Sequence, residues 1–428
     1  MTRAPRPTPP AQPVQPVQPV QPDRKAVRRA AVGVLLIFVA CGFTFASWAS
    51  RLVAIRLTLG LDPGQMGLLL LCWSAGSVSA MPLSGRLIRR FGARQVLIVV
   101  SVVAVIGLLG AGLAATAGSV IAVGALLAAL GVGIGVWDVT MNVAASDTER
   151  ALARTVMPRF HAGYSLGTVL AGALGAGLAQ LGVPVLAHFG LVAALCLGTI
   201  GWSVRTLLTG GAADAAQSPT AQPGARSRPA ARQPGAPGHQ PSAWLEPRVL
   251  VLGLVVLALS LAEGAAGDWL ASGIVQSFGV PEATGIIGLT VFLTAQTAMR
   301  VFGTRLVDRF GRPAAIRASG ACAMIGVALY GLAPWLPLVL IGAAIWGVGA
   351  ALVFPLGMSA AGDDPARAAA RTSVVATIGY GAFLTGPPLL GLLADQVGFR
   401  LAMLALAAPA ALAIIFAGVA RPAADRCG

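Results

Sequence analysis

The chain has 428 residues, of which 56% are hydrophobic and only 11% are charged, and its mean hydropathy is +0.80. A water-soluble protein cannot cover so large an apolar fraction with polar side chains, so the composition excludes an ordinary soluble globular protein. The net charge of +15 invites a nucleic-acid-binding interpretation, but the basic residues fall between long apolar stretches, which argues against it. Lipid is therefore the predicted solvent for most of the chain.

Crossing the hydrocarbon layer takes about 20 apolar residues in a helix. Twelve such stretches lie near residues 31–54, 66–85, 96–115, 119–142, 160–181, 187–208, 249–272, 284–303, 316–334, 337–360, 372–394 and 400–420. Basic residues precede the first stretch, as in a signal peptide, but that stretch is long and others follow it, so we predict an uncleaved helix. The predicted fold class is an all-α integral membrane protein.

The basic residues are distributed unevenly between the two sides of this arrangement. All but three of the 30 lysines and arginines fall on the side of the chain termini, the exceptions being Arg51, Arg56 and Arg400. Loops rich in basic residues stay on the cytoplasmic side of a membrane. We therefore expect a multi-pass protein of the bacterial inner membrane with both termini in the cytoplasm.

Two segments have compositions that cannot build a packed core. Residues 1–29 are predicted to be a disordered, proline-rich cytoplasmic tail, and residues 209–247 a disordered cytoplasmic linker. The linker separates an N-terminal six-helix bundle at 30–208 from a C-terminal six-helix bundle at 248–420. A short cytoplasmic tail at 421–428 completes the predicted organisation.

The two predicted bundles resemble each other in sequence. Tyr164 recurs as Tyr380, at a spacing of 216 residues. Other repeated features are Gly131 and Gly347, Asp147 and Asp363, Gly182 and Gly398, and the segments 87–92 and 306–311. Bundles repeated in the same orientation are related by an axis along the membrane normal, and a solute site then lies between them near the midplane.

A carboxylate and an amide lie in the fourth apolar stretch. Asp138 and Asn142 are four residues apart, so they share one helix face. A carboxylate at the bilayer centre costs about 2.5–3.5 kcal/mol on insertion scales, so acids persist there when they face a watery cavity or a partner. The pair would give a polar solute that travels with a proton both a titratable acid and a hydrogen-bonding amide. A structural polar pair joining two helices is the alternative.

The loop after the eighth stretch carries a family resemblance. Its sequence, Gly-Thr-Arg-Leu-Val-Asp-Arg-Phe-Gly-Arg at 303–312, resembles the signature loop of the major facilitator superfamily of transporters. The resemblance extends over nearly all of residues 30–420 and implies the major facilitator fold, with twelve transmembrane helices in two bundles. It also implies gating contacts by this loop and its first copy, where Arg89 replaces the usual aspartate. The gating candidates are Arg89, Arg90, Gly92, Asp308, Arg309, Gly311 and Arg312.

Further features resemble the fucose-permease-like branch of proton symporters. Asp138 and Asn142 match an acid and an asparagine on the fourth helix, where the resemblance implies a proton-coupling acid, and Phe354 begins a matching aromatic-proline pair. Segments around Trp48 and His161 resemble the related MosC-like subgroup, which is associated with an inositol-derived compound. The first stretch here contains no acid, unlike that of the fucose-permease-like proteins, so two-acid coupling does not carry over whole.

Other charged residues in the apolar stretches are secondary candidates. Glu263 and Asp268 are further proton-coupling candidates that point in different directions, and structural hydrogen bonding is an equal alternative for Asp268. Arg300 is predicted either to reach the cytoplasmic surface or to pair with an acid across the bundle. His161 is predicted to be a neutral side chain satisfied by a loop carbonyl, with a proton relay as the alternative.

Aromatic and amide side chains are the predicted contacts for a solute. The substrate-binding candidates are Asn142, Trp48, Trp137, Gln296, Tyr380 and Phe354. Packing, placement at the membrane interface and interhelical hydrogen bonding are alternatives for these residue types. Trp137 directly precedes Asp138 and cannot share its direction on the helix, which favours packing at that position.

These patterns favour transport over other functions. The cysteines have no metal-ligand spacing and the chain has no nucleotide-binding loop, so no cofactor, enzymatic activity or ATP-driven pumping is expected. We expect a secondary transporter that moves a small polar solute, such as a sugar, polyol or inositol derivative, by alternating access with proton coupling. A multidrug or metabolite exporter of the same superfamily is the alternative. The expected partners are the solute, protons and the lipid bilayer, with no nucleic acid, and the expected state is a monomer.

Overall fold

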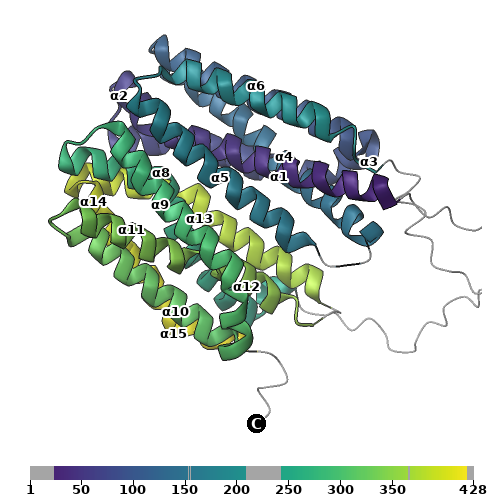
Figure 1. The fold of residues 1–428 in the computed structure, drawn as a ribbon. Coiled ribbons are helices and arrows are strands. Elements are labelled where there is room, and N and C mark those ends of the chain that lie inside the picture. Colours follow the sequence, from purple (N-terminus) through teal and green to yellow (C-terminus); the bar gives the residue numbers. More distant parts are fainter. Residues whose placement is uncertain (1–23, 153, 155, 209–241, 365–366, 422–428) are drawn as a thin grey trace, which may run out of the picture.

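The computed structural model describes residues 24–152, 154, 156–208, 242–364 and 367–421, whose regular structure is helical. The N-terminal half consists of α1 (Arg24–Ser50), α2 (Leu52–Leu59), α3 (Pro63–Thr116), α4 (Val120–Leu152), α5 (Met157–Gln180) and α6 (Val185–Ser203). The C-terminal half consists of η1 (Ala243–Leu245), α8 (Pro247–Phe278), α9 (Glu282–Phe302), α10 (Thr304–Leu332), α11 (Leu336–Ala350), α12 (Val353–Ala361), α13 (Ala368–Val397), α14 (Phe399–Met403), η2 (Leu404–Leu406), α15 (Ala407–Phe416) and η3 (Ala417–Ala420). Figure 1 shows these two halves as neighbouring bundles.

Among the described residues, eleven helices are long and apolar enough to cross a membrane. One of them, α3, has 54 residues and would be about 80 Å long if straight, far more than the roughly 30 Å hydrocarbon layer. It bends at Gly92, whose φ of 79° and ψ of 151° are not helical, so it supplies two crossings. The result is the predicted twelve-span membrane fold. Gly311 forms the corresponding bend in α10, with φ 78° and ψ 164°.

Arg24 is the first residue of α1, and Arg421 is the last described residue. An even number of crossings places both on the same side of the molecule, which we call the terminal side. The opposite side, here called the turn side, carries glycines with positive φ, namely Gly60, Gly118, Gly182, Gly279 and Gly398. Glycine takes this conformation without the steric cost of a Cβ atom. These glycines end or join helices and let the chain reverse within a few residues.

The first helix starts earlier than the sequence analysis predicts. α1 begins at Arg24, so residues 24–29 are helical and do not belong to the predicted tail. Val27 and Ala30 are buried while Arg28 and Arg29 are exposed, because the helical period places the apolar pair on the bundle side. The basic residues in this segment make the helical spacing of its few apolar residues hard to recognise in the sequence.

The second half also begins inside the predicted linker. η1 precedes Pro247, which is the first residue of α8, and proline suits a first helical position because its missing N–H would be unpaired there. The remaining parts of the predicted tails and linker, residues 1–23, 209–241 and 422–428, lie outside the described residues.

Glycines bring the helices within each half close together. In the N-terminal half, a Cβ atom added to Gly42 of α1 would collide with the carbonyl oxygen of Tyr164 in α5. One added to Gly167 of α5 would collide with the carbonyl oxygen of Val39 in α1. Such small residues allow membrane helices to approach at backbone distance, where dispersion contacts are densest. These two close approaches hold α5 against α1 in one orientation.

The two halves meet through α3 with α13 and through α5 with α9. Gly67 of α3 lies against the backbone of Pro387 and Pro388 in α13, and Gly391 of α13 lies against Pro63 at the start of α3. These contacts belong to the turn-side portions of both helices. The halves are therefore packed most closely near the turns.

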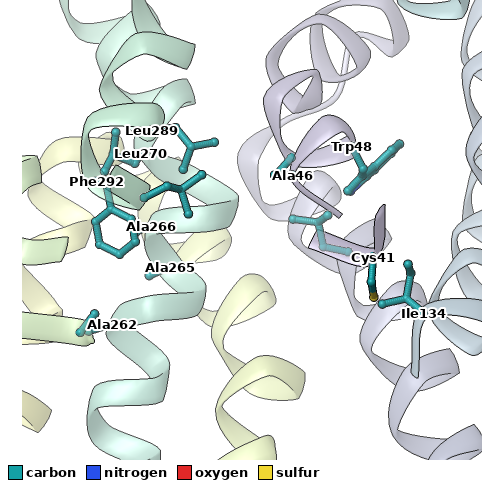
Figure 2. Close-up of a cluster of buried hydrophobic side chains, with 14 of the residues drawn as sticks. Cys41, Ala46, Trp48, Ile134, Ala262, Ala265, Ala266, Leu270, Leu289 and Phe292 are labelled. Atoms are coloured by element: carbon teal, nitrogen blue, oxygen red, sulfur yellow. The ribbon is translucent and has the colours of Figure 1, made fainter. Parts of the chain in front are cut away.

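Each half has an apolar interior of its own. Figure 2 shows one group of buried side chains on α8 and α9, including Leu270 and Phe292, and a second group on α1 and α4, including Cys41 and Ile134. The four cysteines among the described residues are free thiols, and Cys41 and Cys196 are buried.

Candidate functional site

Asp138 and Asn142 lie on one face of α4 and line a cavity of about 480 Å³. Its other lining residues are Val139, Val143, Ser146 and Arg150. These positions recur every three or four residues, so the cavity follows one stripe of the helix from Asp138 toward the terminal side. The sequence correctly predicts that the acid and the amide share a face.

The Asp138 carboxylate has no hydrogen-bond or ion-pair partner among the described residues. Its backbone carbonyl accepts a hydrogen bond from Nδ2 of Asn142 at 2.8 Å, which fixes the Asn142 amide and leaves the Asp138 side chain unpaired. Asp138 is half-buried, so the carboxylate reaches the cavity. A carboxylate in this position can exchange a proton with the cavity without first breaking an ion pair.

The C-terminal half provides a charge pair at a similar depth. Nη2 of Arg300 in α9 lies 2.7 Å from Oε1 of Glu263 in α8, and both side chains are partly exposed. Nε of Arg300 also donates to the carbonyl oxygen of Ala351, just after α11, at 3.3 Å. Of the two predictions for Arg300, pairing across the bundle is therefore the one the structure supports.

Tyr164 of α5 lies within electrostatic reach of Asp138, Glu263 and Arg300. Tyr380 of α13 lies within electrostatic reach of Asp138 as well. Tyr380 is one of the predicted substrate-binding residues and Tyr164 is not, although the 216-residue repeat relates the two positions.

An aromatic group accompanies Tyr380. The rings of Phe354 in α12 and Tyr380 are 5.6 Å apart, and those of Tyr380 and Phe383 are 6.4 Å apart. Phe354 and Tyr380 are both half-buried, so part of each ring is accessible. The structure thus brings together two of the predicted aromatic contacts.

Two other predicted contacts belong to the apolar interior. Trp137 is fully buried, and its indole N–H has no partner among the described residues. Trp48 is 2% exposed and packs on Trp73 and Phe189 at ring distances of 6.4 and 6.1 Å. Neither ring offers surface to a solute in this conformation, so the prediction of direct solute contact does not fit here. Trp137 is directed into the core because it is one residue, or about 100°, away from Asp138.

The remaining polar candidates do not join this cluster. Gln296 is 4% exposed, and its Nε2 is buried without a partner among the described residues. Asp268 is half-buried in α8, and its carboxylate forms no hydrogen bond with another described residue. His161 is exposed and packs edge-on against Phe38 at 5.2 Å, and no carbonyl of the described loop residues holds its ring.

A polar contact absent from the sequence analysis joins the halves on the turn side. Arg51, only 2% exposed, places Nη1 3.2 Å from Oε2 of Glu282 at the start of α9. Its Nε donates to Nδ1 of His188 at 2.9 Å, and its Nη2 donates to the carbonyl oxygen of Val183 at 3.0 Å. We call this Arg51–Glu282 contact the latch. Its partners are 231 residues apart, so no local pattern could reveal it; the one signal is a basic residue on the side where such residues are rare.

Further contacts between the halves extend from the turn side to mid-depth. The Asp395 carboxylate in α13 accepts a hydrogen bond from the Gly64 N–H at 2.9 Å, which satisfies a free donor at the start of α3. Ser74 of α3 donates to the carbonyl oxygen of Phe383 at 2.8 Å. The Asp138 cavity therefore begins near the depth at which these contacts end and continues toward the terminal side.

The predicted gating residues lie at the two bends on the terminal side. Gly92 and Gly311 form the bends, while Arg90 and Arg309 each lie over the phenylalanine that follows, at 5.4 and 5.3 Å. Arg89 and Asp308 are exposed and form no ion pair among the described residues. Of the predicted gating residues, Arg312 forms an ion pair, with Asp363 at 2.6 Å. The contacts implied for Asp308 are thus not made in this conformation.

The family of this chain follows from comparison with known proteins. The Major Facilitator Superfamily profile matches residues 32–267 and 252–426, which together cover most of the chain. The chain belongs to the major facilitator superfamily, and it is a multi-pass membrane transporter of that family. The described residues contain no cluster of three or more histidine, cysteine, aspartate or glutamate side chains that could hold a metal ion.

Curated relatives and solved structures agree with this assignment. The chain is 32% identical to an uncharacterised transporter of Sinorhizobium fredii, over 90% of this chain and 97% of the relative. It is 27% identical to the membrane protein MosC of Rhizobium meliloti, over 86% and 84% of the two chains. The nucleoside transporter NupG superimposes with a TM-score of 0.70 at 14% identity, over 90% of this chain and 99% of NupG. An inward-facing, unoccupied bacterial homologue of the lysosomal transporter Spinster gives a TM-score of 0.68, also at 14% identity, over 93% and 98%. The two solved structures show the shared fold alone.

Proposed function

We propose that this protein is a proton-coupled secondary transporter that carries a small polar solute across the bacterial inner membrane by alternating access. The solute class that fits best is a sugar, a polyol or an inositol derivative. The observation that carries the proposal is the unpaired Asp138 carboxylate at the head of the cavity, next to Asn142.

Asp138 has the properties that a proton-carrying group needs. A buried carboxylate is stable when protonated, and contact with water or a cation favours its charged form. Because Asp138 has no fixed partner among the described residues, a change of access from one side to the other would change its hydration and hence its proton affinity. Glu263 already has Arg300 as a counter-ion at 2.7 Å and is the weaker candidate.

The direction of the cavity supports an inward-facing conformation within this proposal. Basic residues such as Arg86, Arg89, Arg90 and Arg94 are exposed on the terminal side, which the positive-inside rule makes cytoplasmic. The latch closes the opposite, periplasmic side. The structure then represents an inward-facing state, and the latch must open for the bundles to rock to the outward-facing state.

The groups around the cavity suit a neutral solute rich in hydroxyls. Asn142, Tyr164 and Tyr380 offer donors and acceptors, and the accessible parts of the half-buried Phe354 and Tyr380 rings can pack against the apolar face of a sugar or inositol ring. Protonation of Asp138 would leave the Glu263–Arg300 pair balanced in charge, so a neutral solute and a proton could bind together.

The proposal is tested with the full-length protein in proteoliposomes. A thermal-shift screen of hexoses, mannitol and myo-inositol against lipophilic cations first identifies a solute, because a ligand at about 100 times its Kd stabilises the fold by roughly 2.7 kcal/mol. Asp138→Asn should then abolish accumulation driven by a pH gradient but keep counterflow exchange. Asp62→Asn makes the same chemical change at the start of α3, outside the cavity lining, and as the matched control it should keep both activities.

Stabilisation by lipophilic cations alone would favour the exporter instead. Undiminished accumulation by Asp138→Asn would remove this residue from proton coupling and contradict the proposal.

A further inference from the structure

A second cavity lies on the terminal side of the C-terminal half, outside the Asp138 cavity. It has a volume of about 580 Å³ and is formed where α10 bends and where the chain leaves η3. We call it the α10 pocket. Its lining residues are Val307, Phe310, Gly311, Arg312, Pro313, Ala314, Arg317 and Arg421.

The α10 pocket carries more positive charge than its neighbours neutralise. Arg312 pairs with Oδ1 of Asp363 at 2.6 Å, and the other oxygen of Asp363 lies 3.4 Å from Arg248. Both oxygens of the carboxylate are therefore occupied. Arg317 and Arg421 are exposed and form no ion pair within the described part of the chain. Two guanidinium groups remain available to a ligand, and guanidinium forks match the geometry of phosphate oxygens.

The rest of the lining is apolar and lies at the edge of the membrane. Val307, Pro313 and Ala314 contribute aliphatic surface, and the Phe310 ring is 56% exposed. α10 packs against α15, and exposed apolar side chains such as Ile415 and Phe416 occupy the α15 surface before Arg421. Cationic groups next to apolar surface at the end of two spans suit a ligand with an anionic head and apolar chains.

The N-terminal half repeats only part of this charge. At the spacing of 219 residues that relates Gly92 to Gly311, Ala93 corresponds to Arg312 and Ile98 corresponds to Arg317. Arg421 corresponds to Arg205 at the spacing of 216 residues that relates Gly182 to Gly398. The fold repeat alone therefore does not account for the basic pocket.

We infer that the α10 pocket binds the phosphate-bearing headgroup of an anionic phospholipid from the adjacent leaflet. Arg317 and Arg421 contact the phosphate, and the acyl chains follow the exposed apolar surface of α10 and α15. A soluble phosphate compound shares the headgroup chemistry but gains nothing from this apolar surface. The inference is independent of which solute the protein transports.

Lipid titration of the full-length protein in neutral detergent tests this inference. The probes are phosphatidylglycerol, phosphatidylcholine and inorganic phosphate, and the readouts are native mass spectrometry and the thermal transition. The test variant is Arg317→Gln with Arg421→Gln. The matched control is Arg86→Gln with Arg94→Gln, which removes two exposed arginines from the same side of the N-terminal half.

Phosphatidylglycerol should bind the wild type and the control equally, and the test variant about fivefold more weakly for each arginine removed. Phosphatidylcholine should bind more weakly, with little difference between the proteins. Equal affinity of the test variant and the wild type for phosphatidylglycerol would overturn the inference, as would an equal loss in the control. Stabilisation by inorganic phosphate as strong as by the lipid would identify a soluble anion and overturn the lipid assignment.

Discussion

The two halves repeat the same fold but place different charges within their spans. In the N-terminal half, Asp138 has no partner among the described residues, whereas in the C-terminal half Glu263 is paired with Arg300 at 2.7 Å. At the repeat position of Asp138, the second half has Phe354, which packs on Tyr380. A repeated fold can thus carry one acid that is free to exchange a proton and one charge pair that stays balanced.

On the terminal side the two halves also differ in their ion pairs, and again the pairs named here belong to the C-terminal half. The C-terminal half pairs Asp363 with Arg312 and Glu246 with Arg371, at 2.6 and 2.9 Å. In the N-terminal half, Arg89 and Arg90 are exposed and form no ion pair with the described residues. A repeated backbone fold therefore does not predict that charged side chains and their ion pairs are repeated. The function of each charged residue must be assigned separately in each half.

The largest expected effect separates the two acids functionally. Asp138→Asn should eliminate uphill solute accumulation, because an amide cannot carry the proton. The double variant Glu263→Gln with Arg300→Gln removes a balanced pair, so it should raise the KM for the solute but keep uphill accumulation. Both are measured by solute uptake in proteoliposomes with an imposed pH gradient. Loss of coupling in the double variant alone would reverse the assignment of the two halves.

The latch should give the next largest effect. Glu282→Gln leaves the buried Arg51 charge without its counter-ion in the closed state, which should cost about 1–2 kcal/mol and shift the population toward an open turn side about 5- to 30-fold. Spin labels at Leu181 and Trp335, both exposed on the turn side in different halves, report the separation in a cysteine-free background.

Asp62→Asn is the control for the latch experiment. It removes an acid from the turn side at the start of α3 without touching the contact between halves. A distance distribution that is the same for wild type and Glu282→Gln would show that the latch does not hold the turn side closed.

A smaller effect is expected from breaking the Glu263–Arg300 pair on one side only. Both side chains are about a quarter exposed, so screening by water limits the loss for Glu263→Gln to about 1 kcal/mol of unfolding free energy. Adding Arg300→Gln should restore part of that loss, because it removes the unpaired cation. Thermal unfolding of the four proteins of this double-mutant cycle measures the coupling, and additive losses would show that the pair contributes no stability.

The last comparison tests whether the repeat holds at the bends. Gly92→Ala and Gly311→Ala place a Cβ atom at φ values of 79° and 78°, with no heavy atom near enough to clash at Gly92. Only glycine populates this combination of φ and ψ readily, so the backbone strain should cost about 1–3 kcal/mol of unfolding free energy in each case. Similar drops in the thermal transition would confirm the equivalence of the bends, and a drop in one variant only would contradict it.

The sequence predicts much of the fold, because the twelve apolar stretches and the repeated bends are local signals. It also predicts that Asp138 and Asn142 share a face, since that follows from helical spacing alone. The pairing of Arg300 with Glu263 and of Arg51 with Glu282 depends on how helices 37 and 231 residues apart are rotated and packed. The same rotation decides that Trp48 and Trp137 face the core, which residue type cannot reveal.

The central claim is that Asp138 carries the proton that moves with the solute. The most direct test is to record proton flux with a pH-sensitive dye inside proteoliposomes while a solute gradient alone drives uptake. The wild type should move protons with the solute, and Asp138→Asn should admit the solute down its gradient with no accompanying proton movement. Proton movement at the wild-type ratio in Asp138→Asn would contradict the account.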